Sequence, residues 1–307
     1  MTGGGANAPA VSVLVATFNA ARLLRLSLAS VLRQDMADFE VLVTGDGCTD
    51  DSEQVVSSFG DPRLSFANRS TNSGSQAAPH NDGFARARGA WIAYLGHDDL
   101  WFPSHLSSLL AFAKESGADA VHSLCAFLGP RSVGAIGAPK PGVSYTRHFV
   151  PPSSLMHRRV LFDEIGPWGD PDRLPMPVDL EFLARAARHG ARIGFLPRLT
   201  VLKWPSPWWR SYSDSWDLPQ HAAFASLESD SRALEVATLE SLALAGAQAL
   251  HGGDDPPGAI VRTAARALLR TAVESWGRGR WPLRPFFVRR VRRQRRAIRA
   301  KRGLPPA

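Results

Sequence analysis

The feature that most constrains the fold of this chain is a repeated pattern of a short apolar run, a polar turn and a helical segment. The apolar runs lie at Val11–Ala16, Phe39–Val43 and Trp91–Leu95, and they are rich in β-branched and aromatic residues. Such short, mostly apolar runs are typical of parallel strands buried on both faces. Between the first two, apolar residues recur at helical spacing from Leu23 to Leu32. Strands that alternate with helices predict an α/β fold with a mainly parallel sheet and right-handed crossovers.

Two carboxylates follow these predicted strands directly. Asp46 comes just after the second run and Asp98 just after the third. In open α/β sheets a ligand binds beyond the carboxyl ends of the strands, where both side chains would converge on one crevice. The pattern therefore predicts a binding site at this edge without identifying the ligand.

The remaining elements follow from the same reasoning. Further strands are predicted at Ser65–Ala67, Ala120–Phe127, Ile193–Leu196 and Thr200–Leu202. Helices are predicted to begin at Thr49–Glu53, to end over Gly83–Ala90, and to span Val160–Ile165, Leu180–His189, Arg232–Leu250 and Ala259–Trp276. Asn19 is predicted to cap the first helix. The Gly- and Pro-rich segment Gly129–Gly142 is predicted to be a loop.

Composition excludes several classes of protein. Hydrophobic residues make up 44% of the 307 residues, too many for a chain that is disordered throughout. No apolar run approaches the roughly 18–20 residues of a membrane span, and the first residues lack the basic and apolar parts of a signal peptide. Cys48 and Cys125 are too few for a disulfide scaffold and are expected to be buried, inert thiols. We therefore expect a cytoplasmic protein.

The net charge of +8 is concentrated near one end of the chain. Twelve of the 36 Lys and Arg residues lie between Arg278 and Arg302, so the rest of the chain carries a net charge of −4. Because the body does not share the basic character, nucleic-acid binding is disfavoured. The segment FFVRRVRRQRRAIRAKR is either a solvated extension or a part that binds an anionic membrane surface. The second interpretation would place the protein at the inner face of a membrane.

Four motifs in the first half of the chain resemble those of glycosyltransferase family 2. In order over residues 11–110 they are VSVLVATFNAARLLRLSLASVLRQ, VLVTGDGCTDDS, NSGSQAAPHNDGFARARGAWIAYL and GHDDLWFPSHL. Members of this family are inverting enzymes of the GT-A fold that use nucleotide-sugar donors. The resemblance implies a GT-A (Rossmann-like), mixed and mainly parallel sheet flanked by helices, with a helical C-terminal extension. It also implies transfer of a sugar to an acceptor hydroxyl.

The resemblance further implies roles for individual residues. Asp46 matches the carboxylate that accepts a hydrogen bond from the nucleotide base, and Asp98 matches the position that binds the metal. The backbone around Thr17 and Asn19 would line the same pocket. The remaining donor positions in the third motif are Gln76 and Asn81. Mg²⁺ or Mn²⁺ suits a site of carboxylate and phosphate oxygens, because the cation neutralises charge that develops on the diphosphate.

Three positions depart from the family pattern. Gly96 stands where the family has the first acid of its Asp-x-Asp motif, and Gly45 stands where an acid is also common. His80 occupies the place of an arginine that would face the diphosphate. Substitution of these groups would weaken metal binding or make it depend on bound donor. His80 and His97 are candidates to replace part of the missing functions.

The second half of the chain has to supply the catalytic base. An inverting transfer needs a carboxylate that takes the proton from the acceptor hydroxyl. Asp179, at the start of a predicted helix, matches the family's base, and Glu181 is its rival. Lys203 follows a predicted strand and is expected to meet the departing diphosphate. Arg210 and Tyr212 lie nearby in the sequence, and the candidates for packing or sugar contacts are Trp204, Trp208 and Trp209.

These observations predict four regions and leave two functions open. The regions are a disordered leader at 1–10, a GT-A-like domain at 11–215, a helical region at 216–277 and the basic segment at 278–307. The first hypothesis is an inverting, metal-dependent, hexosyltransferase-like enzyme of surface polysaccharide, glycolipid or glycoconjugate synthesis. The alternative is a non-catalytic nucleotide-sugar-binding or scaffold protein that retains the fold.

Overall fold

The computed structural model describes residues 8–129, 133–139, 142, 144–204 and 218–251. Residues Met1–Leu242 form one compact unit and Ala243–Ala307 a second. The fold described below is that of the first unit. The predicted helix Ala259–Trp276, the leader up to residue 7 and the basic segment 278–307 lie outside the described residues.

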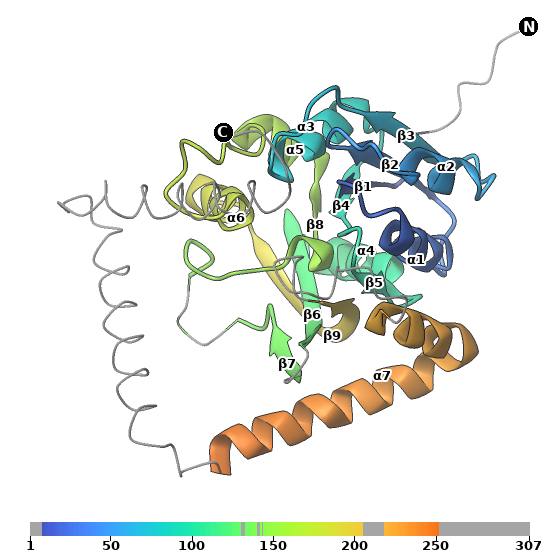
Figure 1. Cartoon of the computed structure of the whole chain (residues 1–307). Helices are drawn as coiled ribbons and strands as arrows, with labels where there is room; N and C mark the ends of the chain where they lie inside the picture. Colours follow the sequence, from blue (N-terminus) through green and yellow to red (C-terminus); the bar gives the residue numbers. More distant parts are fainter. Residues whose placement is uncertain (1–7, 130–132, 140–141, 143, 205–217, 252–307) are drawn as a thin grey trace, which may run out of the picture. The chain divides into compact units, whose positions relative to one another are not determined.

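Strands and helices alternate through the first half of the chain, as predicted (Figure 1). The strands are β1 Val11–Thr17, β2 Phe39–Gly45, β3 Leu64–Asn68, β4 Trp91–Tyr94, β5 Leu100–Trp101, β6 Ala120–Leu128, β7 Val133–Ile136, β8 Leu155–Arg158 and β9 Ile193–Lys203. The helices are α1 Ala21–Leu32, α2 Ser52–Ser57, α3 Ala77–Arg86, α4 His105–Ser116, α5 Arg159–Ile165, α6 Val178–His189 and α7 Pro219–His251. A short 3₁₀ turn at Pro152–Ser154 precedes β8.

The strands form one mixed sheet in the order β3-β2-β1-β4-β8-β6-β9-β5, with β7 paired to β6. Strands β1 to β4 are mutually parallel, and β6 is parallel to β9. Because β8 is antiparallel to both β4 and β6, these two strands run in the same direction. The carboxyl ends of β1, β2, β3, β4, β6 and β9 therefore lie at one edge of the sheet.

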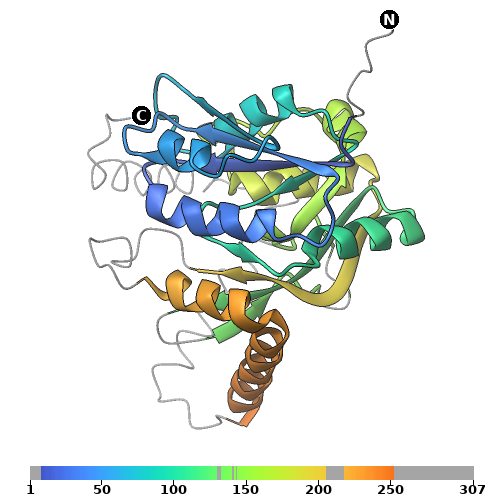
Figure 2. The ribbon, with the colours of Figure 1, turned by 90° about the vertical axis from the view of Figure 1, so that its right-hand side faces the viewer.

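Side chains alternate between two apolar layers on opposite faces of the sheet. Figure 2 shows the helices that lie on either side of the sheet. From β1, Val11, Val13 and Val15 join a core with residues of α1, α2 and α4. Leu14 faces the other way and joins a core with residues of α3, α5 and α6. This period-two alternation explains why the strands are apolar at almost every position. Helices cover both apolar layers of the sheet.

A third apolar cluster joins the edge strands to the first half of α7. Phe224 and Leu227 of the helix pack with Leu202 and Trp204 at the end of β9. Inside α7, Asp230 leaves helical geometry at φ −155° and ψ 92°, so the helix consists of two segments joined by a kink. Among the described residues, no helix is both long and apolar enough to cross a bilayer.

Several predicted boundaries are wrong for identifiable reasons. The Gly129–Gly142 segment contains the short strand β7, which pairs with β6. The two strands predicted after residue 193 form a single strand, β9. Its register relative to β6 shifts near Leu124, and Pro197 and Arg198 of β9 interrupt the apolar pattern there. Helix α3 ends at Arg86, because the Ala87 backbone is extended. Strands β5 and β8 and helix α4 were not predicted.

The predicted cap of the first helix is also wrong. Asn19 adopts a positive φ of 45°, and its amide bonds Thr49 instead. The N–H of Ala21 at the start of α1 donates to the carboxylate of Asp50 at 2.9 Å. The other oxygen of Asp50 accepts from the N–H and hydroxyl of Ser52, where α2 begins. One carboxylate therefore serves the N-termini of two helices.

Candidate active site

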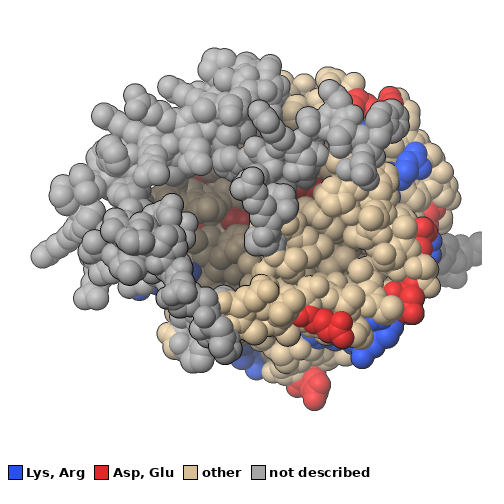
Figure 3. Space-filling view, turned by 60° about the horizontal axis from the view of Figure 1, so that its bottom comes forward, with Lys and Arg blue, Asp and Glu red and all other residues tan. Residues whose placement is uncertain are grey.

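The candidate site lies at the carboxyl edge of the sheet. The residues at or just past these strand ends are Thr17, Asp46, Asn68, Asp98, Asp99 and Lys203. Strand order reverses between β1 and β4, so the sheet has its switch point there, where ligands of open α/β sheets bind. Figure 3 shows a hollow on one face of the molecule with acidic side chains on its floor.

Thr17, at the end of β1, is buried, and its hydroxyl has no hydrogen-bond partner within the described part of the chain. Its carbonyl accepts the N–H of Asp46 at 2.8 Å. In the loop after the neighbouring strand β4, Nδ1 of His97 lies 3.2 Å from the carbonyl oxygen of Ala16. Burial of a hydroxyl without a hydrogen-bond partner destabilises the folded protein. A ligand that forms a hydrogen bond with the Thr17 hydroxyl would remove this destabilisation.

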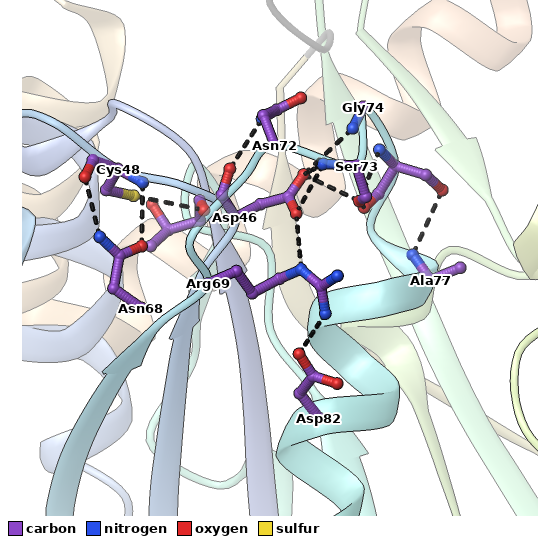
Figure 4. A network of polar contacts seen from close by, with 11 residues as sticks. Asp46, Cys48, Asn68, Arg69, Asn72, Ser73, Gly74, Ala77 and Asp82 are labelled. Carbon is purple, nitrogen blue, oxygen red and sulfur yellow. Dashed lines mark hydrogen bonds and ion pairs between the residues drawn. The ribbon is translucent and has the colours of Figure 1, made fainter. Parts of the chain in front are cut away.

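Asp46 is buried, and its carboxylate is already surrounded by donors (Figure 4). The carboxylate accepts the N–H of Ser73 at 3.0 Å, the hydroxyl of Ser73 at 2.9 Å and the N–H of Gly74 at 3.2 Å. Arg69, which also pairs with Asp82 on α3, lies with Nε 3.3 Å from the same carboxylate. Burial raises the pKa of Asp46, and these bonds offset only part of the shift. In this structure the side chain fastens the loop after β3.

The turn after β2 explains the missing acid at Gly45. The amide of Asn68, at the end of β3, accepts the N–H of Cys48 at 2.9 Å and donates to its carbonyl at 2.8 Å. A Cβ atom at Gly45 would lie 2.4 Å from Oδ1 of Asn68. An acid at this position would therefore displace the side chain that holds the turn. Cys48 itself is only half-buried, contrary to the prediction, whereas Cys125 is buried.

A second polar cluster brings Asp99 and Lys203 together. Asp99 is completely buried, and its carboxylate accepts Nζ of Lys203 at 2.8 Å and the hydroxyl of Ser153. The N–H of Trp204 lies 3.4 Å from its other oxygen. Asp98 is also buried, and its charge acts on Lys203. The predicted donor residues Asp98 and Lys203 therefore belong to one cluster.

The charges of this cluster support each other. Burial by itself would lower the pKa of Lys203, but the carboxylates of Asp99 and Asp98 more than offset this and hold the pKa above its ordinary value. Burial raises the pKa of Asp99, while Lys203 and Ser153 act in the opposite direction. A buried ion pair of this kind persists only because each charge compensates the other. Lys203 therefore remains a cation at this edge.

Asp179 lies in the first turn of α6 and is half-buried, and one of its carboxylate oxygens accepts the N–H of Leu180 at 2.8 Å. Burial raises its pKa, and the Leu180 N–H and the positive charge of Lys203 offset part of that rise. The rival Glu181 instead makes two bonds to Arg185, both at 3.0 Å, one turn along the helix. The positive charge of Lys203 therefore acts on Asp179, whereas the carboxylate of Glu181 is engaged by Arg185.

His80 is placed differently from what was expected. It is buried on α3, with its ring 4.9 Å from that of Tyr94 and 5.1 Å from that of Trp168, centroid to centroid. Burial lowers its pKa to about 3, so the ring is neutral near pH 7. It cannot replace the positive charge of an arginine beside a diphosphate.

Asn81 is engaged within the protein. Its amide donates to the carbonyl of Trp168 at 3.0 Å and accepts the Trp168 N–H at 2.9 Å, which ties α3 to the segment before α6. A donor contact from this side chain would require one of these bonds to break. Gln76 is the half-buried N-cap residue of α3 and makes no capping bond with its side chain. Donor roles for both remain predictions.

Of the tryptophans after β9, only Trp204 is described, and it is 4% exposed within the third apolar cluster. This burial supports a packing role for Trp204 and not stacking of its ring on a sugar. Trp208, Trp209, Arg210 and Tyr212 lie outside the described residues.

A family model described as glycosyl transferase family 2 matches residues 12–127. The chain contains a family 2 glycosyltransferase domain. The match covers β1 to β6 nearly completely, with Thr17, Asp46 and the Asp98–Asp99 pair, and it ends before Asp179 and Lys203.

Curated glycosyltransferases are similar to part of this chain. GalNAc(5)-diNAcBac-PP-undecaprenol beta-1,3-glucosyltransferase of Campylobacter jejuni is 34% identical over 113 residues, which are 36% of this chain and 36% of that protein. The aligned stretches span between 30% and 53% of the curated relatives.

Solved structures share the GT-A glycosyltransferase fold of the family 2 domain. S. aureus TarS 1–349 in complex with UDP has a TM-score of 0.53 and 25% identity, over 64% of this chain and 61% of that one. Mannosyltransferase PcManGT of Pyrobaculum calidifontis, in complex with GDP-Man and Mn²⁺, has a TM-score of 0.53 over 95% of this chain and 87% of that one. At 18% identity the second likeness concerns the fold alone.

Sequence reasoning missed three residues that organise the site, Asn68, Arg69 and Ser153, and the pairing of Asp99 with Lys203. Asp99 leads directly into the buried strand β5, and an acid at such a position needs a cationic partner; this signal could have linked it to Lys203. Asn68 is the last residue of the short strand β3, and Arg69 follows it. The sequence of this strand contains no pattern that predicts their contacts. Ser153 lies in the 3₁₀ turn before an unpredicted strand, and nothing in its sequence context pointed to Asp99.

Proposed function

We propose that this protein transfers a sugar from a nucleoside-diphosphate donor to an acceptor hydroxyl, with inversion at the anomeric carbon. The observation that carries the proposal is the meeting of one cation and three carboxylates at the carboxyl edge. The charge of Lys203 acts on Asp98, Asp99 and Asp179. A diphosphate leaving group needs positive charge, and an attacking hydroxyl needs a carboxylate base.

The donor nucleotide would occupy the edge formed by β1 and β2. The unpartnered Thr17 hydroxyl offers a hydrogen bond there, and the backbone near Asn19 and the turn after β2 adjoin it. Because the Asp46 carboxylate is occupied by Ser73 and Gly74, a base would bond it only by exchange with one of these donors. The diphosphate would extend toward Lys203, whose ammonium favours negative charge.

A divalent cation would depend on the donor for most of its ligands. The described residues contain no group of three or more His, Cys, Asp or Glu side chains able to hold a metal. Asp99 is taken by Lys203, and Gly96 has no side chain. Asp98 would be the protein ligand, and one carboxylate plus phosphate oxygens is a common arrangement for Mg²⁺. Bound in this way, Mg²⁺ or Mn²⁺ would neutralise charge on the diphosphate.

Asp179 would act as the base. Its carboxylate would accept the proton of the acceptor hydroxyl while the hydroxyl oxygen forms a bond to the anomeric carbon. The bond between that carbon and the diphosphate oxygen breaks, and the nucleoside diphosphate leaves with the bonding electron pair. Its raised pKa strengthens a carboxylate as a base, and the Leu180 N–H fixes the orientation of one oxygen.

The relatives and the basic segment support the proposal of a lipid-linked acceptor. The Campylobacter relative is named for a diphospho-undecaprenol acceptor. A lipid-linked acceptor in surface polysaccharide or glycolipid synthesis would suit a protein held at an anionic membrane surface by residues 278–307. A cytoplasmic protein bound to the inner face of the membrane would meet both its donor and such an acceptor.

A non-catalytic, nucleotide-sugar-binding role is the second candidate. Three observations favour it: Asn68 occupies the space of an acid at Gly45, the carboxylates of Asp98 and Asp99 occupy the space beside Gly96, and His80 is neutral. Against it stands Asp179 at the start of α6, with its raised pKa.

Two measurements separate these possibilities. A thermal-shift screen with UDP, GDP, ADP, CDP and TDP, with and without Mn²⁺, tests for the nucleotide site; no stabilisation by any of them contradicts both functions. With the donor that binds, hydrolysis is then compared between wild type, Asp179→Asn and the matched variant Glu181→Gln. The enzyme hypothesis predicts a loss of about 100-fold or more in Asp179→Asn only. No turnover in wild type despite donor binding favours the second candidate.

A further inference from the structure

Asp99 and its partner Lys203 differ in their exposure to solvent. Asp99 is 0% exposed, whereas the side chain of its partner Lys203 is 21% exposed. Part of the Lys203 side chain therefore faces solvent, whereas the Asp99 carboxylate does not. The contacts of Asp99 are all internal: Nζ of Lys203 at 2.8 Å, the hydroxyl of Ser153 and the N–H of Trp204 at 3.4 Å.

These contacts join three distant parts of the chain. Asp99 follows β4, Ser153 lies in the turn before β8, and Lys203 ends β9. The hydroxyl of Ser153 also accepts the N–H of Gly96 at 3.0 Å, which ties the start of the same loop to the turn. The Asp99 carboxylate is thus held rigidly on one side, and it presents Lys203 with a fixed acceptor. A long lysine side chain loses considerable rotamer freedom when it is ordered, and an internal anchor removes that cost before the ligand arrives.

We propose that Asp99 is a positioning residue that holds the Lys203 ammonium toward the diphosphate of the donor. This inference rests on the proposed function, because it assumes that a nucleoside diphosphate binds at this edge. Asp99 acts only through Lys203, so its influence concerns the phosphates and not the nucleoside.

The test measures equilibrium binding of the nucleoside diphosphate that stabilises wild type, and of the corresponding nucleoside, by calorimetry. The variants are Asp99→Asn, Lys203→Met and the double variant, all as the full chain. Asp61→Asn is the matched control, because Asp61 pairs with Arg63 at 2.7 Å away from this cluster. We expect Asp99→Asn to weaken diphosphate binding by about 10- to 100-fold, the value of a charge-assisted hydrogen bond. Nucleoside binding should stay unchanged in every variant.

The double variant gives the decisive comparison. If Asp99 acts through Lys203, adding Asp99→Asn to Lys203→Met causes no further loss of diphosphate affinity. Equal factors in both backgrounds, or equal weakening of nucleoside and diphosphate, would overturn the inference. Loss of one partner of a buried pair destabilises folding; should Asp99→Asn not fold, the comparison of Lys203→Met with the double variant still decides. Absence of diphosphate binding in wild type would contradict the proposed function instead.

Discussion

Substitution of Gly96 tests how tightly the acidic cluster is packed. A Cβ atom at this position would lie 2.7 Å from Oδ2 of Asp99 and 2.9 Å from Oδ1 of Asp98. Neither distance is compatible with a normal contact. Asp99 cannot simply rotate away, because Lys203 and Ser153 hold the same Oδ2 atom. A methyl group would therefore strain the cluster, and an added carboxylate would also repel two acids.

The expected magnitude follows from these contacts. Overpacking a well-filled site costs about 1–3 kcal/mol, and we expect Gly96→Ala to fall in this range. For a chain of this size that is a decrease in Tm of roughly 2–12 °C. Gly96→Asp restores the acid of the family motif, yet we expect it to cost more than about 3 kcal/mol, because it also disturbs a buried ion pair.

Denaturant unfolding followed by fluorescence gives the free energy of unfolding of each variant. Gly134→Ala in β7 is the matched control, since a Cβ atom there would meet nothing within 4 Å. Binding of the donor nucleotide is measured in parallel, with and without Mn²⁺. If Gly96→Ala proves as stable as Gly134→Ala, the carboxylates are free to move and the packing argument is wrong. Tighter Mn²⁺-dependent binding by Gly96→Asp without loss of stability would refute it more strongly.

Two further predictions concern stability away from the donor. Burial lowers the pKa of His157 to about 4, from an unfolded value near 6.5, so its contribution to stability is complete above pH 6.5 and is lost as the pH falls toward 4. Between pH 8 and pH 5 the free energy of unfolding should fall by about 2 kcal/mol more in wild type than in His157→Gln; the exposed His189→Gln serves as control, and equal pH dependence in all three would contradict the low pKa. Asp50→Ala removes the acceptor at the starts of α1 and α2 and should cost about 1–2 kcal/mol. Glu53→Ala, in the first turn of α2, should cost less; equal unfolding midpoints would show that Asp50 does not cap both helices.

The first half of the fold could be predicted because its strands are buried on both faces. Val11–Ala16 and Phe39–Val43 are apolar except for Ser12 and Glu40, and each ends within two residues of the observed boundary. Strand β8 was missed because LMHR contains a histidine and an arginine. His157 is buried there through a hydrogen bond with Tyr94 at 2.8 Å, a compensation that no local pattern reveals.

The site was predictable where it follows strand ends and unpredictable where it depends on partners. Asp46, Asp98 and Lys203 were found from their places after strands. The carboxylate of Asp46 accepts hydrogen bonds from Ser73 and Gly74, and that of Asp99 accepts one from Ser153. These partners are 27 to 54 residues away in the sequence, so no local pattern predicts them. Sequence alone identified the groups that carry charge but not which of them the protein neutralises internally.

The antiparallel strand β8 also has a consequence for how the chain is made. Strand β6 pairs with β8 and β9, so a nascent chain that ends near residue 127 has neither partner for it. At that point the family 2 segment 12–127 is complete, yet Asp99 lacks both Ser153 and Lys203. Since chains fold from the N-terminus as they emerge, the Asp99 carboxylate cannot be buried with a counter-charge until β9 is in place. The buried pair of Asp99 and Lys203 therefore forms only after both halves of the fold have been synthesised.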